Sequence, residues 1–165
     1  MSDWFATYGF AEVRDGLLIG AYPLDADDVT MLATMRVDRI LNLVEDQEYA
    51  PGRRLAVEEA LAEAGIPEER MSLTDFGHLP SDQLELAVQM VTGWLRQDLL
   101  CYVHCRAGWQ RSAAVAAGAI AIRDALGIDE ALAQVRRRKP SADPLPHQLD
   151  DLRRWWAQRS GLQRR

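Results

Sequence analysis

One thiol and one guanidinium lie close together in the stretch from Leu99 to Ala113. Cys105 and Arg111 are separated by five residues, an apolar run precedes the cysteine, and small residues follow the arginine. This pattern predicts a buried strand, a tight loop and a helix. A loop of this length can direct its backbone N–H groups, with the N-terminus of the following helix, at one oxyanion. The sequence therefore predicts an anion-binding cup with Cys105 at its floor and Arg111 on its wall.

The predicted cup also favours ionisation of the thiol. A free cysteine has a pKa of about 8.5 and supplies little thiolate at neutral pH. The N–H groups of residues 106–111, the helix N-terminus and Arg111 all favour negative charge, so we expect a markedly lowered pKa for Cys105. The planar guanidinium of Arg111 can bind two oxygens of an oxyanion at once. Gly108 permits the sharp bend that such a loop needs.

The stretch His104-Cys105-x5-Arg111-Ser112 resembles the His-Cys-x5-Arg-Ser motif of the cysteine-dependent protein tyrosine phosphatases. The chain as a whole resembles their small, atypical dual-specificity branch. The resemblance implies a covalent cysteinyl-phosphate on Cys105 and assistance by Ser112 when the thiolate departs. It also implies that His104 fixes the loop by hydrogen bonding and that neither a metal nor a cofactor takes part. The residues expected to bind the substrate phosphate are Arg106, Ala107, Gly108, Trp109, Gln110 and Arg111.

A second segment, residues 73–81, is bracketed by Gly and Pro and is predicted to be a loop. Asp75, Gly77, Pro80 and Ser81 are similar to the Asp-x-Gly-x-Pro-Ser pattern of the family's movable general-acid loop. The resemblance implies that Asp75 donates a proton to the leaving alcohol and then acts as base toward water. An aspartate in a loop is usually a cap or turn residue, so this role depends on its position before the Cys105 motif.

Asn42 is a polar residue inside the apolar run 39–44. A buried amide without partners costs about 1–3 kcal/mol, so it must find hydrogen bonds. The resemblance implies that Asn42 braces the phosphate loop. The alternative is that Asn42 merely ends its strand.

Strand and helix patterns alternate along the chain, which calls for a sheet covered by helices. We expect a mostly parallel α/β sheet of about five strands with helices on both faces, as in the protein tyrosine phosphatases, and one domain over residues 1–165. In the helix at 52–64, the side chains expected to face inward are Leu55, Ala56, Leu61 and Ala62. The strands are predicted at 10–13, 17–20, 39–44, 71–73 and 99–103, and the helices at 25–35, 52–64, 81–97, 113–122, 129–138 and 146–160.

The composition is that of a soluble globular protein, with 48% hydrophobic and 27% charged residues. No apolar run approaches the ~18 residues of a membrane span, and residues 1–5 do not resemble a signal peptide. We therefore expect a cytoplasmic protein without a membrane partner. Cys101 and Cys105, roughly 13 Å apart along a strand, are too far apart for a disulfide.

The charge is unevenly distributed. The chain carries a net charge of −6, but residues 136–165 carry +6 and residues 1–135 carry −12. The overall acidity argues against nucleic-acid binding. The favoured interpretation of the basic region is solvated helix faces, with a docking surface for an anionic partner as the alternative. We expect a monomer.

The sequence thus predicts a phosphomonoester hydrolase whose partner is a phosphorylated substrate. The favoured function is a protein phosphatase for phosphotyrosine that can extend to phosphoserine and phosphothreonine. The first alternative is a phosphatase of a non-protein ester, such as a phosphoinositide or a nucleotide. The second is a phosphate-binding module without catalysis, which the presence of Cys105, Arg111 and Asp75 disfavours.

Overall fold

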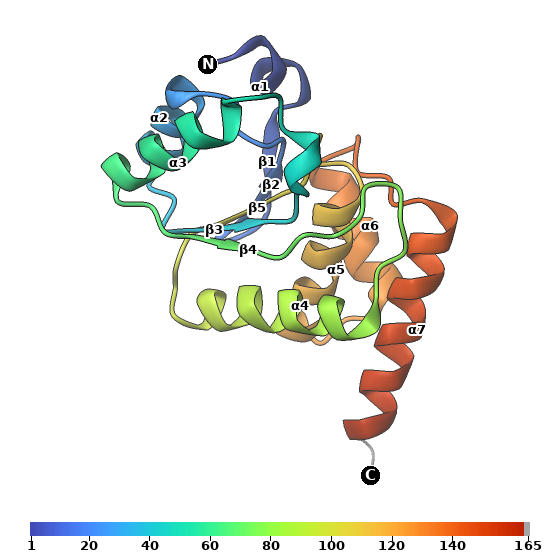
Figure 1. Ribbon diagram of the computed structural model, residues 1–165. Coiled ribbons are helices and arrows are strands. Elements are labelled where there is room, and N and C mark those ends of the chain that lie inside the picture. Colours follow the sequence, from blue (N-terminus) through green and yellow to red (C-terminus); the bar gives the residue numbers. More distant parts are fainter. Residues whose placement is uncertain (164–165) are drawn as a thin grey trace.

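A five-stranded mixed sheet in the order β1-β2-β5-β3-β4 forms the centre of the computed structural model, which describes residues 1–163 (Figure 1). β1 and β2 form an antiparallel hairpin, and all other neighbouring strands are parallel. The mostly parallel sheet expected from the sequence is confirmed. The strands are β1 (Phe10–Arg14), β2 (Leu17–Gly20), β3 (Arg39–Asn42), β4 (Glu68–Arg70) and β5 (Cys101–His104).

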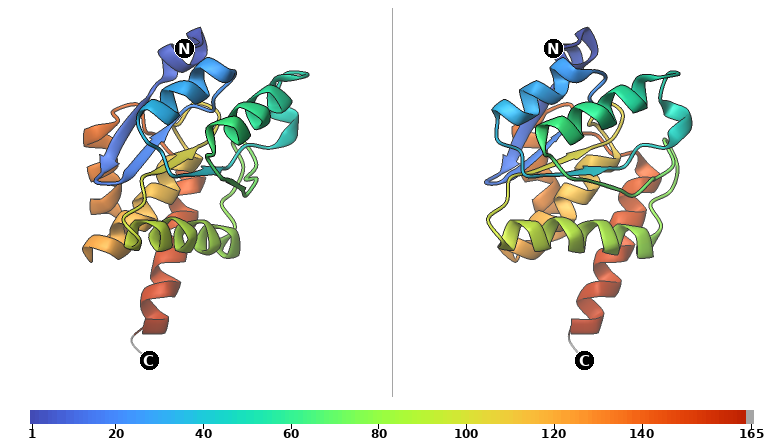
Figure 2. Two further views of the ribbon diagram at one scale, coloured as in Figure 1. Left: turned by 90° about the vertical axis from the view of Figure 1, so that its left-hand side faces the viewer. Right: turned by 60° about the vertical axis from the view of Figure 1, so that its left-hand side comes forward.

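Helices cover both faces of the sheet (Figure 2). One layer packs on Leu18, Ile40 and Tyr102 and consists of α1 (Asp3–Tyr8), α2 (Ala26–Thr34) and α3 (Arg53–Ala64). The other layer packs on the opposite face, against Ile19 and Val103. It consists of α4 (Ser81–Arg96), α5 (Arg111–Asp124), α6 (Ile128–Arg138) and α7 (Pro146–Gln163). A short 3-10 helix, η1 (Asp46–Glu48), follows β3.

α5 lies at the centre of its layer because its side chains are small. A Cβ atom on Gly118 would lie 2.6 Å from Cγ2 of Val88 on α4 and 3.1 Å from the ring of Trp155 on α7. Glycine therefore lets three helices approach each other at this point. The close packing fixes the N-terminus of α5 directly behind the loop that carries Cys105.

The fourth strand lies earlier than the sequence indicated. We expected it at 71–73, whereas β4 comprises the polar residues Glu68–Arg70. β4 is an edge strand that pairs only with β3, so its side chains can remain partly in solvent. Met71 and Leu73 still donate backbone hydrogen bonds to Asn42 and Leu43, at 2.9 and 3.0 Å, and continue irregularly along the end of β3.

Two further details differ from the sequence-based expectation. The buried side of α3 consists of Val57, Ala60 and Leu61, whereas Leu55 is 59% exposed. The expected inward position is therefore confirmed for Leu61 and wrong for Leu55, Ala56 and Ala62, which are exposed. α1 and η1 were not predicted, because each is too short to show helical periodicity.

Candidate active site

The loop that carries Cys105 lies where β5 ends and α5 begins. Cys105 is 3% exposed, and the loop from residue 105 to residue 110 bends at Gly108, whose φ is +75°. A Cβ atom on Gly108 would lie 2.5 Å from the carbonyl carbon of Gly20 in β2. Only glycine therefore fits this position, for its backbone angle and for its close approach to the neighbouring strand.

Cys105 lies in an environment that stabilises its thiolate. Burial opposes ionisation, but the charge of Arg111 and hydrogen bonds from Ser112 and from the N–H of Gln110 lower the pKa of Cys105 below its ordinary value. The Sγ atom lies 3.4 Å from Oγ of Ser112. Cys101 provides the contrast, because burial raises the pKa of its thiol to about 12. Both cysteines are free, and only Cys105 is activated.

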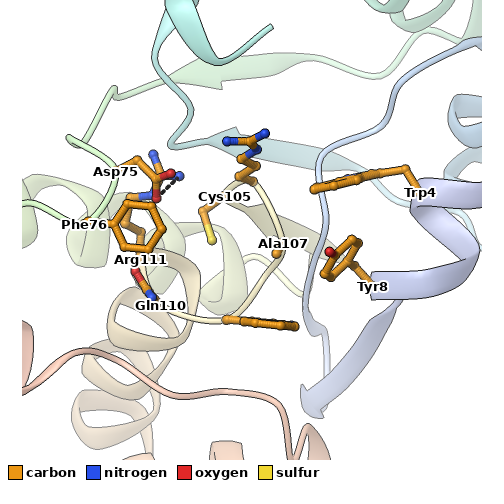
Figure 3. Close-up of a pocket in the computed structure, with 10 residues that line it drawn as sticks. Trp4, Tyr8, Asp75, Phe76, Cys105, Ala107, Gln110 and Arg111 are labelled. Carbon is orange, nitrogen blue, oxygen red and sulfur yellow. Dashed lines mark hydrogen bonds and ion pairs between the residues drawn. The ribbon is translucent and has the colours of Figure 1, made fainter.

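Arg111 is 1% exposed and is held by the carboxylates of Glu48 and Asp75, of which Figure 3 shows Asp75. Its Nη1 and Nη2 atoms donate to Oε2 and Oε1 of Glu48, at 2.8 and 2.7 Å, in a bidentate ion pair. Nη2 also donates to Oδ1 of Asp75 at 3.0 Å. The carbonyls of Leu73 and Leu43 accept from Nη1 at 2.9 and 3.3 Å. These contacts fix the plane of the guanidinium beside the thiol.

Glu48 is the main residue that the sequence analysis missed. Its side chain is 7% exposed, and its Oε2 atom also accepts a 2.8 Å hydrogen bond from the N–H of Glu45. Burial alone would raise the pKa of Glu48, but the hydrogen bonds from Arg111 and Glu45 lower it below its usual value. The available signal was the group of acidic residues directly after β3, at the same edge of the sheet as the cysteine loop.

Asp75 lies in an irregular segment between β4 and α4, residues 74–80, which we call the acid loop. Its carboxylate points toward Arg111 at the wall of the pocket (Figure 3), and its side chain is 20% exposed. The structure thus brings Asp75 of the acid loop to Cys105, Arg111 and Ser112, which lie together in one stretch thirty residues later in the chain.

Asn42 does not bond to the cysteine loop through its side chain. Its Nδ2 atom donates to the Tyr49 hydroxyl at 2.7 Å and to Glu68 at 3.3 Å, and its Oδ1 atom accepts from the N–H of Val44 at 2.8 Å. The amide therefore braces the segment that carries Glu48 and stabilises the cup only through Arg111. Its hydrogen bonds also show that Asn42 does more than end its strand.

His104 supports the loop by packing. It is fully buried, and within residues 1–163 neither ring nitrogen has a hydrogen-bond partner. Its ring lies 5.8 Å from that of Tyr102, and burial lowers the pKa of His104 to about 3. The imidazole is therefore neutral. The backbone of Cys105 opposes this shift by raising the pKa, and the expected role of His104 in fixing the loop by hydrogen bonding stays a prediction.

Aromatic side chains form one wall of the pocket, which has a volume of about 290 Å³. Trp4 and Tyr8 come from α1 and Trp109 from the cysteine loop, with ring centroids 4.2 Å apart for Trp4 and Tyr8 and 5.5 Å apart for Tyr8 and Trp109. The loop residues Arg106, Ala107 and Gln110 also line the pocket, together with Phe76 of the acid loop. The contribution of α1 was not predicted.

α1 is anchored at both ends, so its two aromatic rings are held in place. Ser2, its N-cap residue, donates from its N and Oγ atoms to the carboxylate of Asp28 at 2.7 and 2.6 Å. At the other end, Nζ of Lys139 donates to the carbonyl of Tyr8 at 3.1 Å. Phe5 lies between them and is fully buried in the core. The aromatic wall is thus a fixed part of the pocket.

Residues 1–163 contain no cluster of three or more His, Cys, Asp or Glu side chains that could hold a metal ion. None of the helices in the same part of the chain combines the length and apolar character needed to cross a membrane.

Comparison with known proteins gives a family and a fold. Residues 17–158 match the model of the dual specificity phosphatase catalytic domain. No curated protein sequence matches the chain.

Several solved structures share the fold. The crystal structure of PTPMT1 in complex with PI(5)P has a TM-score of 0.81 and 22% identity, and the match covers 93% of this chain and 98% of that one. Tk-PTP in the active form has a TM-score of 0.77 and 21% identity, covering 90% and 96%. Human DUSP28 has a TM-score of 0.71 and 21% identity, covering 92% and 95%. At these identities the matches show the fold alone.

Proposed function

The chain belongs to the dual specificity phosphatase catalytic domain family and is a cysteine-dependent phosphatase, and we propose a role for each active-site residue on this basis. The Cys105 thiolate is the nucleophile. It attacks the phosphorus of a phosphomonoester, and the bond from phosphorus to the ester oxygen breaks. The single observation that carries the proposal is the geometry at the N-terminus of α5, where the Cys105 thiol lies 3.4 Å from Oγ of Ser112 and Arg111 is held in place by Glu48.

Arg111 and the loop N–H groups stabilise the phosphoryl group in transfer. Charge spreads over its equatorial oxygens in the transition state, and donors that are already in place stabilise that charge without reorganisation. We assign the phosphate cup to Arg106, Ala107, Gly108, Trp109, Gln110 and Arg111. Glu48 supports this role by holding the guanidinium in one orientation.

Asp75 acts twice in the proposed mechanism. As the carboxylic acid it gives its proton to the departing ester oxygen, and as the carboxylate it then takes a proton from the water that attacks the cysteinyl-phosphate. The bond from phosphorus to sulfur breaks in this second step, and the hydroxyl of Ser112, 3.4 Å from Sγ, stabilises the departing thiolate. Inorganic phosphate leaves, and the free thiolate is restored.

A phosphotyrosine protein is the substrate that we favour. Trp4, Tyr8 and Trp109 form an aromatic wall beside the cup, and a phenyl ring can pack against them. Small alkyl groups would leave this wall uncovered. Phosphoserine and phosphothreonine are therefore secondary substrates.

A second candidate is a non-protein phosphate ester that carries another anionic group, such as a phosphoinositide. Arg106 lies on the pocket wall with the central carbon of its guanidinium 5.8 Å from the centroid of the Trp4 ring, and the residue is exposed. This exposed cation is suited to a second phosphate. The complex of PTPMT1 with PI(5)P indicates that a related fold accepts such a ligand.

The test is hydrolysis by purified protein of phosphopeptides, phosphoinositides, nucleotides and a generic aryl phosphate. We expect the wild type to hydrolyse the aryl phosphate and Cys105→Ser to be inactive, with phosphotyrosine peptides the best substrates. A phosphoinositide as the best substrate would favour the second candidate. If both proteins are inactive and both bind phosphopeptide, the chain is a binding module and the proposal is wrong.

We further propose one domain over residues 1–165, a monomer, and a cytoplasmic location. Among the exposed large hydrophobic side chains, Phe76 and Trp109 line the pocket, and Met1, Leu55 and Leu86 lie on separate parts of the chain, which supports a monomer. A reducing compartment keeps the Cys105 thiol free, which supports the location. Light scattering of the purified protein and fractionation of cells test these two statements.

A further inference from the structure

The acid loop is attached to α7 by a row of hydrogen bonds. His147, Gln148 and Asp151 lie on one side of the first turns of α7, because positions i, i+1 and i+4 share a helix face. We call these three side chains the α7 latch. His147 and Asp75 are separated by more than seventy residues in the sequence, so this contact is made only by the fold.

Each of the four loop residues after Asp75 has one bond to the α7 latch. Nε2 of His147 lies 2.8 Å from the carbonyl of Phe76, and Nε2 of Gln148 donates to the carbonyl of Gly77 at 3.1 Å. Oδ2 of Asp151 accepts from the N–H of Leu79 at 2.9 Å and lies 2.8 Å from Nδ1 of His78. Three of these bonds attach the loop backbone to the helix, at Phe76, Gly77 and Leu79, and the fourth attaches the side chain of His78.

Two members of the latch are buried, and this shows that the contact is built into the fold. Gln148 is fully buried and Asp151 is 5% exposed. A buried amide or carboxylate is costly unless it is hydrogen-bonded, and the acid loop supplies those bonds. The other oxygen of Asp151 accepts from Arg154 at 3.1 Å, and Oε1 of Gln148 accepts from the N–H of Leu145 at 3.0 Å.

The loop needs this external support because its backbone is not relaxed. Phe76, next to Asp75, has a φ of +57°, in the left-handed region that L residues seldom adopt. Such a conformation persists when the surroundings hold it in place. The His147 bond to the Phe76 carbonyl acts on this residue directly.

We propose that His147, Gln148 and Asp151 are positioning residues that hold the acid loop so that Asp75 reaches the leaving oxygen. The inference rests on the proposed role of Asp75 as general acid. It makes α7, which supplies no residue to the pocket wall, a part of the catalytic apparatus. None of the three lines the pocket, so their effect passes entirely through Asp75.

The first test uses four variants and two esters. His147→Ala removes the bond to Phe76, and Asp151→Asn removes the charge and one of the two oxygens that hold Leu79, His78 and Arg154. His147→Gln keeps an amide nitrogen near the position of Nε2, and Asp150→Asn is the matched control on the exposed side of α7. The esters are p-nitrophenyl phosphate, whose leaving group needs little protonation, and a phosphoserine peptide, whose leaving group needs a proton. Kinetic constants for both esters and inhibition by vanadate are measured.

The expected result is a selective loss. Because general acids contribute about 10²–10⁴-fold, a misplaced Asp75 should lower kcat for the phosphoserine peptide about tenfold or more, and for the aryl ester about twofold or less. KM and vanadate inhibition should stay unchanged, since the cup is intact. His147→Gln and Asp150→Asn should behave as wild type. An equal loss on both esters, or no loss on the peptide, would overturn the proposal.

Hydrogen exchange separates this inference from the proposed function. The backbone amides of residues 76–79 should exchange faster in Asp151→Asn and His147→Ala than in Asp150→Asn, whether or not the protein turns over a given ester. Unchanged exchange would show that α7 does not hold the loop. A wild type without Cys105-dependent hydrolysis would instead refute the proposed function.

Discussion

The ion pair between Glu48 and Arg111 offers the sharpest test of the site, through the substitution Glu48→Gln. The change keeps the size of the side chain and one carbonyl oxygen. It removes the charge and places an amide NH2 group against a guanidinium that can only donate. Arg111 and Glu48 are 1% and 7% exposed, so water cannot replace the lost bond.

The magnitude follows from the contacts. Removing one partner of a buried ion pair costs about 3–5 kcal/mol. Because Arg111 retains its hydrogen bonds to Asp75 at 3.0 Å and to the carbonyl of Leu73 at 2.9 Å, we expect a loss of stability at the lower end of this range. A loss of about 3 kcal/mol corresponds to a fall in melting temperature of roughly 6–12 °C for a domain of this size. A misoriented Arg111 should lower kcat/KM about tenfold, less than the ~10²–10³-fold cost of removing such a donor.

The dependence of stability on pH tests the direction of the shift in the Glu48 pKa. The pKa of Glu48 is lower in the folded protein than in the unfolded chain, so its contribution to stability is fully present above the unfolded pKa of about 4.3. It is lost as the pH falls through the folded pKa. The difference in unfolding free energy between wild type and Glu48→Gln should therefore be constant near neutral pH and shrink in acid.

Thermal and urea unfolding, with hydrolysis of an aryl phosphate, measure these effects. Glu59→Gln, the same change at an exposed position of α3, is the control and should match the wild type. If Glu48→Gln melts within about 2 °C of the wild type and retains its activity, Glu48 does not hold Arg111 and the reasoning is refuted. A stability difference that grows in acid would contradict the direction of the pKa shift.

Three further predictions follow from the same geometry. The rate of alkylation of Cys105 by iodoacetate should rise with pH with a midpoint below the free-cysteine pKa of about 8.5. Cys101 should stay unreactive because its pKa is raised to about 12. A midpoint above 8.5 for Cys105 would contradict its role as the nucleophile. Asp75→Asn should lower kcat strongly for alkyl phosphates and weakly for nitrophenyl phosphate, and equal losses would argue against a general acid. Trp4→Ala should lower kcat/KM for phosphotyrosine peptides about 2–10-fold and leave phosphoserine peptides unchanged, as expected for loss of one aromatic contact; the same loss on both peptides would show that the wall does not select aryl groups.

The sequence predicted those parts of the site that are contiguous in the chain. The strand, the bend at Gly108 and the small-residue helix adjoin one another, and each local signal indicates the same structure. Cys105, Arg111 and Ser112 therefore lie where the motif predicts. The sheet followed from the alternation of strands and helices.

The parts that could not be predicted are joined across long stretches of chain. The bond from Lys139 to Tyr8 spans 131 residues, and the bond from Gln148 to Gly77 spans 71. Neither hydrophobic periodicity nor motif spacing predicts contacts between residues so far apart in the sequence. Helix α1 and the role of α7 depend on them, and both emerge only when the chain is folded.

Glu48 is an intermediate case, because physical reasoning limits the possible anionic partners of Arg111 to a few residues but does not choose among them. A guanidinium buried between an all-small helix and the sheet must have an anionic partner. The carboxyl ends of parallel strands meet at one edge of the sheet, so the acidic residues after β3 and Asp75 after β4 are the available partners. Glu45, Asp46 and Glu48 all satisfy that condition, and only the single turn of η1 directs Glu48 inward while Asp46 faces solvent and binds Arg70. The partner of Arg111 is thus decided by a three-residue turn, which is the scale at which sequence patterns carry least information.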